Sequence, residues 1–110
     1  MANSSRNIKV VSFNVNRVLN PIKRSKILSK LRREGARVAF LQETHLTEVE
    51  HSKLKRGGFK HLFCSSYKSG HRRGAAILIS NQVQYEHISE TKDKEGRYVM
   101  IIGRIDGNTL

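Results

Sequence analysis

The fold is decided by residues 8–46, which read IKVVSFNVNRVLNPIKRSKILSKLRREGARVAFLQETHL. The run from Ile8 to Phe13 is β-branched and apolar on both alternating faces, which is typical of a central strand covered from both sides. A second short apolar strand is predicted from Val38 to Leu41. With a helix between them, these strands form a βαβ unit and run parallel, joined by a right-handed crossover. Their carboxyl ends then meet at one sheet edge, where open α/β sheets usually bind ligands.

The segment between the two strands carries helix signals at both ends. Asn20 is placed to cap the first turn, and Pro21 to occupy the first helical position. Gly35 is placed to end the helix in a left-handed conformation. The helix has an apolar stripe of Ile27, Leu28 and Leu31 on an otherwise basic surface.

After residue 46 the pattern changes to antiparallel strands. Thr47 and Glu50 form the capping box of a second short helix, which Gly57-Gly58 ends. Further strands are predicted at residues 59–66, 75–80, 83–88 and 98–105. Asp106-Gly107 is a hairpin turn signal with few residues after it. We therefore expect an unfinished hairpin, an edge strand at residues 99–102 without its partner, and a truncated single domain over residues 1–110.

Composition points to a polyanionic partner. The 110 residues include 21 Lys plus Arg against 9 Asp plus Glu, a net charge of +12. Such a surface attracts nucleic acid, although a merely solubilising basic surface would have the same composition. The single cysteine, Cys64, excludes an internal disulfide and is predicted to be a buried, inert thiol. No membrane span or secretion signal is present in the sequence, which favours a nuclear or cytoplasmic location.

Two polar residues follow the parallel strands and could share a cation. Asn14 and Glu43 each come just after an apolar run, and neighbouring strands lie about 4.8 Å apart. A carboxylate, an amide oxygen and waters are hard ligands of the kind that Mg²⁺ prefers. From the residues alone the alternative to a metal site stays open. In that alternative Asn-Val-Asn simply starts a turn, and the glutamate after the strand faces water.

Four segments in order resemble the endonuclease/exonuclease/phosphatase family, whose members include deoxyribonuclease-I-like enzymes and apurinic endonucleases. They are Ile8 to Asn16, Phe40 to Leu46, Gly74 to Ser80 and Asp93 to Tyr98. The form Gln-Glu-Thr-His-Leu at residues 42–46, together with the basic helix, is most similar to the endonuclease domain of LINE-type retrotransposon polyproteins. The resemblance covers nearly the whole chain, which corresponds to only about the N-terminal half of the family's domain.

The resemblance implies a fold and a set of site residues. The fold is α/β (α+β), the first half of a four-layer α/β/β/α sandwich whose exposed sheet face gives a route to self-association. Glu43 binds the catalytic Mg²⁺, with Mn²⁺ as a substitute, and Asn14 supports the metal. His45 and Thr44 lie beside the scissile phosphate. The DNA-contacting residues are Thr44, Lys68, Arg72, Arg73, Arg97 and Tyr98. The remaining partner is the rest of a reverse-transcriptase polyprotein.

Two departures from the family qualify these expectations. Its later aspartate and histidine motifs, which activate water, would fall beyond Leu110, so we expect the isolated polypeptide to be inactive. The family usually has glycine where this chain has Arg17, so a β-carbon there strains the loop if a positive φ is required.

Several alternatives remain at this stage. The basic loop from Lys68 to Arg73 is either a phosphate contact or a flexible hairpin tip, and His45 is either a site residue or a solvent-exposed histidine. The other histidines, at 51, 61, 71 and 87, lack metal-ligand spacing and are predicted to be surface or strand residues. The rival functions are a non-catalytic, basic nucleic-acid-binding remnant and a fragment of an apurinic DNA-repair endonuclease. His45 speaks against the latter, since those enzymes commonly carry lysine there.

Overall fold

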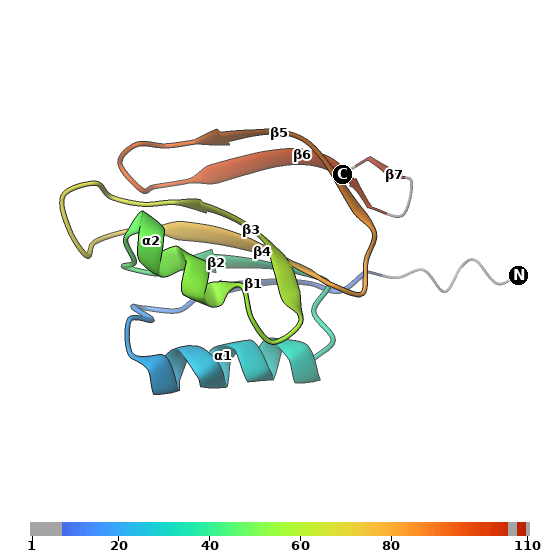
Figure 1. The fold of residues 1–110 in the computed structure, drawn as a ribbon, viewed down its shortest axis with the longest axis horizontal. Helices are drawn as coiled ribbons and strands as arrows, with labels where there is room; N and C mark the ends of the chain where they lie inside the picture. The colour runs from blue at the N-terminus through green and yellow to red at the C-terminus, as the bar shows by residue number, and fades with distance from the viewer. Residues whose placement is uncertain (1–7, 106–107, 110) are drawn as a thin grey trace, which may run out of the picture.

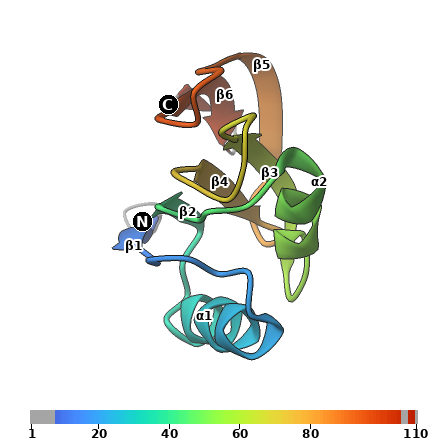
Figure 2. The same cartoon turned by 90° about the vertical axis from the view of Figure 1, so that its left-hand side faces the viewer.

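A computed structural model describes residues 8–105 and 108–109 of the chain. Its strands form two sheets that lie one above the other (Figure 1), a four-stranded sheet of order β1-β2-β4-β3 and a three-stranded sheet of order β5-β6-β7. Helix α1 covers the outer face of the first sheet, and the second sheet lies on the opposite side (Figure 2). The mixed α+β fold with an α/β/β layering confirms the predicted class.

The predicted βαβ unit is present. It consists of β1 (Val10–Asn14), α1 (Pro21–Arg33) and β2 (Val38–Gln42), and β1 pairs parallel to β2. The Asn20 side chain caps α1 by accepting bonds from the backbone N–H groups of Ile22 and Lys23. Gly35 follows the helix with φ of +75°, as the left-handed cap required. Leu28 and Leu31 are the buried residues of α1.

The second helical segment and the next strands also follow the sequence signals. Helix α2 (Glu48–His51) has the complete capping box of Thr47 and Glu50 and continues into the 3-10 helix η2 (Ser52–Leu54). Strands β3 (Phe59–Ser65) and β4 (Ala75–Ser80) pair antiparallel, and β4 also pairs antiparallel with β2.

The second sheet contains β5 (Tyr85–Lys92), β6 (Val99–Ile105) and β7 (Asn108–Thr109). The prediction of a strand at residues 83–88 was wrong in its bounds. Val83 is instead a buried turn residue whose N–H donates to the Ser80 carbonyl, and β5 extends to Lys92 because it pairs along β6. Strand β6 pairs with β5 from Val99 to Ile105, whereas β7 pairs with it at Arg104 and Ile105 alone. Within the described residues, 99–102 therefore have β5 on one side and no paired strand on the other, as predicted for an edge. The hairpin signal Asp106-Gly107 lies outside the described residues.

Two apolar clusters hold the layers together. One packs α1 against the first sheet around Leu31, Leu41 and Leu78. The other joins the two sheets around Ile77, Ile79 and Ile105. Cys64 is buried, which confirms that part of its prediction, and burial raises the pKa of its thiol.

Strand β1 differs from its prediction as a central strand. It is the edge strand of its sheet, because among residues 8–105 and 108–109 only β2 pairs with it. Its inward face is also uncovered, since β5 and β6 lie over β3 and β4. Val10 and Phe40, on this face, expose 55% and 37% of their surface. No helix in the described part of the chain is long and apolar enough to span a membrane.

Candidate active site at the carboxyl ends of β1 and β2

One edge of the first sheet collects the residues singled out in the sequence. Asn14 is opposite Gln42 in the β1–β2 register, Gln42 is opposite Ala75, and Ala75 is opposite Ser65. Glu43 directly follows Gln42, so Asn14 and Glu43 leave neighbouring parallel strands at the same end. The backbone therefore brings Asn14 and Glu43 to the same edge of the sheet, on neighbouring strands.

The loops beyond this edge are joined by backbone hydrogen bonds. Val15 N–H donates to the Gln42 carbonyl (3.0 Å), Arg17 N–H to the Glu43 carbonyl (2.7 Å) and Val18 N–H to the Thr44 carbonyl (3.1 Å). The loop after β1 thus runs alongside the segment after β2. Asn14 adds an Asx turn, because its Oδ1 accepts a bond from the Asn16 N–H at 3.0 Å.

The backbone in this region is strained. The non-glycine residues described with positive φ are Asn16, Arg17, Glu43, His45 and Arg73, and the first four belong to the two adjoining loops. Arg73 is next to them, since its carbonyl accepts a bond from the His45 N–H at 2.6 Å. Strained backbone conformations concentrate at functional sites, where surrounding contacts enforce them. Arg17 has φ of +76°, so the family's glycine position does require a positive φ and the β-carbon is strained here.

Side chains connect the same residues. His45 Nε2 lies 3.1 Å from Glu43 Oε1, and Arg17 Nε lies 3.5 Å from His45 Nδ1. Because an arginine can only donate, these partners assign the proton to Nε2, and His45 donates it to Glu43. The Glu43 side chain is 48% exposed and His45 is 18% exposed. Histidine therefore orients a carboxylate that faces solvent.

The donor set here is sparse but suits a hard cation. Glu43 offers a carboxylate, and Asn14 an exposed amide oxygen with a second lone pair beyond its Asx bond. Magnesium usually takes one or two carboxylates and completes its shell with water and substrate phosphate. Within residues 8–105, no group of three or more His, Cys, Asp or Glu side chains could hold a metal by itself. Asn14 and Glu43 therefore suit a site in which water and substrate phosphate complete the metal's shell.

A buried network supports this loop from behind. Thr44, which lies between Glu43 and His45, is fully buried, and its Oγ1 is 2.8 Å from His51 Nε2. His51 Nδ1 is 2.9 Å from Ser66 Oγ. The prediction of His51 as a surface or strand residue was wrong, because α2 turns it inward onto the loop before β4. Burial is the main cause that lowers its pKa to about 4, so the ring is neutral and rigidly bonded.

This role for Thr44 differs from the predicted one. Its side chain faces the interior, away from any phosphate at the surface, and it fixes the segment that carries Glu43. The sequence held one unused signal for the network: His51 shares its inward helical face with Thr47 and Leu54, the latter buried in the core.

The predicted nucleic-acid residues divide into two groups. The guanidinium groups of Arg72 and Arg73 lie 5.6 and 5.0 Å from the centre of the Tyr67 ring, and Arg73 also contacts Glu95 at 3.3 Å. This part of the basic loop is therefore organised by a cation–π platform. Lys68 is exposed beside it.

Arg97 and Tyr98 belong to the β5–β6 turn. Arg97 is bound to Asp93 through its Nε (2.7 Å) and Nη2 (3.2 Å), which holds the pKa of the Asp93 carboxyl far below its usual range. Tyr98 is 45% exposed. A bond from the Gly74 N–H to the Gly96 carbonyl (2.8 Å) joins this turn to the candidate site.

A solved structure has a similar fold. The chain matches the solved structure of an AP endonuclease from Archaeoglobus fulgidus with a TM-score of 0.53 and 23% sequence identity. The match covers 94% of this chain and 39% of that chain. This chain thus has the fold of part of the AP endonuclease structure.

Sequence comparison adds a more particular relative. The chain is 36% identical over 107 residues to the Transposon TX1 uncharacterized 149 kDa protein of Xenopus laevis. That alignment covers 93% of this chain and 8% of the transposon protein, so the chain spans a small part of its relative. No protein-family model matches the chain. The predicted resemblance is confirmed: the chain has an endonuclease-like fold and is similar in sequence to part of a transposon protein.

Proposed function

We propose that this chain is the N-terminal half of an Mg²⁺-dependent DNA endonuclease domain from a LINE-type retroelement. The observation that carries the proposal is the convergence of Asn14, Glu43 and His45 on one strained, hydrogen-bonded pair of loops. The transposon relative and the endonuclease neighbour support it. Its partners are DNA and the remainder of a reverse-transcriptase polyprotein.

In this proposal each residue has a distinct role. Glu43 and Asn14 hold Mg²⁺, with Mn²⁺ as a substitute. The bound cation supplies electrostatic stabilisation of the charge that develops on phosphate oxygens. His45 donates its Nε2 proton to Glu43 and so fixes the direction of the carboxylate. The Tyr67 platform with Arg72 and Arg73 offers stacking and phosphate contacts to the DNA.

The 110-residue polypeptide alone is expected to be inactive. An in-line attack on phosphorus requires a group that activates water, and the sequence has just two aspartates, Asp93 and Asp106. Asp93 is bound to Arg97 in the β5–β6 turn. We therefore expect no Mg²⁺-dependent nicking of a supercoiled plasmid by this polypeptide, even though the metal and the DNA bind.

Metal binding tests the proposal without requiring turnover. Mn²⁺ added to ¹⁵N-labelled protein is expected to broaden the amide signals around Asn14 and Glu43, and Glu43→Gln should abolish this. Glu48→Gln is the matched control, because Glu48 is an exposed glutamate with one 4.0 Å ion pair to Lys92. Broadening that persists in Glu43→Gln, or that centres elsewhere, would contradict the assignment.

The rival functions give different results. A non-catalytic basic remnant binds DNA with a strong salt dependence that EDTA does not alter and shows no Mn²⁺ site at Glu43. A fragment of an apurinic endonuclease, the class of the solved neighbour, would prefer duplexes containing an abasic site. We also propose that the uncovered face with Val10 and Phe40 causes self-association at high concentration, which sedimentation velocity can detect.

A further inference from the structure

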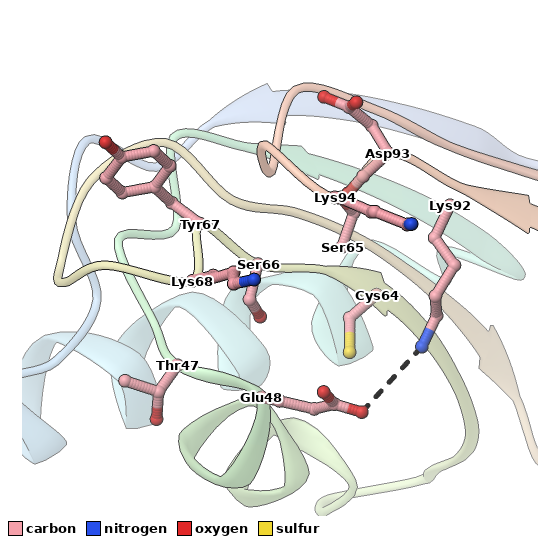
Figure 3. A pocket seen from close by; sticks show the side chains of 10 residues that line it. All are labelled: Thr47, Glu48, Cys64, Ser65, Ser66, Tyr67, Lys68, Lys92, Asp93 and Lys94. Atoms are coloured by element: carbon pink, nitrogen blue, oxygen red, sulfur yellow. Dashed lines mark hydrogen bonds and ion pairs between the residues drawn. The ribbon is translucent and has the colours of Figure 1, made fainter.

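A cavity of about 500 Å³ (Figure 3) has walls that include none of Asn14, Glu43 and His45, the residues of the candidate active site. It is bounded by the start of α2, the end of β3 and the β5–β6 turn. Its walls include Thr47, Glu48, Cys64, Lys68, Lys92 and Lys94. A cavity of this size is within the range of small-ligand sites.

The charges around the cavity favour an anion. The ammonium groups of Lys68, Lys92 and Lys94 lie around it, whereas the Asp93 carboxylate points away (Figure 3). Asp93 is occupied by Arg97 at 2.7 Å, so its charge is already compensated. The other acidic lining group is Glu48, which is 78% exposed and 4.0 Å from Lys92. An ion pair that long and that exposed is weak and leaves the lysine available to a ligand.

The serine hydroxyls of the wall are already engaged. The Ser65 hydroxyl donates to the Asp93 carbonyl, and the Ser66 hydroxyl is bonded to His51. Burial raises the pKa of the Cys64 thiol, so this group stays neutral. The cationic groups of the wall are the three lysines. Lysine recognises phosphate as a mobile point charge, without the planar geometry that arginine imposes.

The position of the cavity relates it to Glu43. Ser65 on β3 is in register with Asn14 on β1, with β4 and β2 between them. The two residues are therefore three strand spacings apart, or about 14 Å. Each nucleic-acid strand presents a phosphate about every 3.4 Å along the helix axis. A strand held at Glu43 thus has further phosphates within reach of the cavity. Ser66 also links its wall to the Glu43 segment through His51 and Thr44.

We propose that the cavity between Lys68, Lys92 and Lys94 is a second phosphate subsite, which holds a backbone phosphate of the same nucleic-acid strand a few nucleotides from Glu43. The subsite rests on the proposed function for its ligand. It fixes the register and direction of the strand and carries no base specificity.

The test compares two triple variants of equal charge. The subsite variant combines Lys68→Gln, Lys92→Gln and Lys94→Gln. The control variant combines Lys26→Gln, Lys30→Gln and Lys55→Gln, which replace three exposed lysines elsewhere. Affinity for a short DNA duplex is measured by fluorescence anisotropy in EDTA over a series of salt concentrations. The subsite variant is expected to reduce the magnitude of the salt slope by about one unit per lost phosphate contact. The control variant should change it by less than half as much. Equal changes in the two variants would overturn the subsite.

Inorganic phosphate provides an independent probe. At constant ionic strength, it should shift the amide signals of residues 66–68 and 92–94 saturably in the unmodified chain, and not in the subsite variant. Shifts spread over all lysines, with no saturation, would refute the proposal. Both measurements are made without metal, so loss of the Mn²⁺ site in Glu43→Gln tests the endonuclease assignment separately.

Discussion

Lowering the pH should destabilise this protein through one buried ring, that of His51. Its pKa in the folded chain is about 4, against an ordinary value of 6.5, because burial disfavours the charged form. The unfolded chain therefore takes up a proton at a pH where the folded chain does not. Stability is fully present above pH 6.5 and declines as the pH falls toward 4. Between about pH 7 and about pH 5 the expected loss is about 2 kcal/mol, from one proton and these two pKa values.

Denaturant unfolding at a series of pH values measures this loss. The variant His51→Gln should be less stable at neutral pH, since it cannot bond both Thr44 and Ser66. Its stability should also depend much less on pH in the same window. His61, whose pKa is lowered by burial and by nearby lysines, contributes in the same direction, so His61→Gln is the control. Glu34 and Glu50 have lowered pKa values and lose their contributions at more acidic pH.

Two results would refute the argument. One is a free energy of unfolding whose pH dependence is the same in His51→Gln as in the unmodified chain. The other is a His51 imidazole NMR signal that titrates near 6.5. Either result would mean that the ring is hydrated and that the Thr44 segment has another support.

Two substitutions test the strained loops. Arg17→Gly should raise the free energy of unfolding by about 0.5–1 kcal/mol, because glycine adopts the observed φ of +76° without a β-carbon clash; Arg17→Ala, which keeps the β-carbon, should not. A stabilised alanine variant would argue against strain as the cause. Gly74→Ala should lower the free energy of unfolding by roughly 2–4 kcal/mol, since its φ is +100° and a β-carbon would collide with Thr44 Oγ1. Gly70→Ala, with a positive φ and open space around it, is the control and should cost much less.

The parts of the fold that local signals encode were predictable from the sequence. The Asn20 cap, the Gly35 terminus and the Thr47–Glu50 capping box each depend on a few adjacent residues, and all three occur as predicted. The parallel pairing of β1 with β2 followed from the helix between them, since a helical crossover joins parallel strands. Errors arose where pairing over long sequence separations decides the outcome. Strand β5 begins at Tyr85, later than the predicted start at Val83, because its register with β6 and the burial of Val83 set its start.

The candidate site shows the same division. The placement of Asn14 and Glu43 followed from strand order, whereas the bond from His45 to Glu43 depends on a positive φ that no local pattern indicates. His51 was misassigned because α2 is a single short turn, and the helical face that it shares with Leu54 was the one local sign of its burial. The lysine cavity joins residues from β3, β5 and α2, and only the tertiary structure brings these together.

The strained backbone conformation persists because the strain lies in a few residues, whereas the hydrogen bonds that hold them come from several parts of the chain. Glu43 and His45 both have φ of +57°, a conformation that costs most residues on the order of 1 kcal/mol. The segment is nonetheless held by bonds to the loop after β1, to the Arg73 and Gly74 carbonyls, and through Thr44 to His51. These contacts come from three separate parts of the chain, so we expect no single substitution at the surface to release the segment. Arg17, at φ of +76°, therefore adds strain without unfolding the loops, and the carboxylate of Glu43 stays directed at solvent, where a cation and a phosphate could reach it.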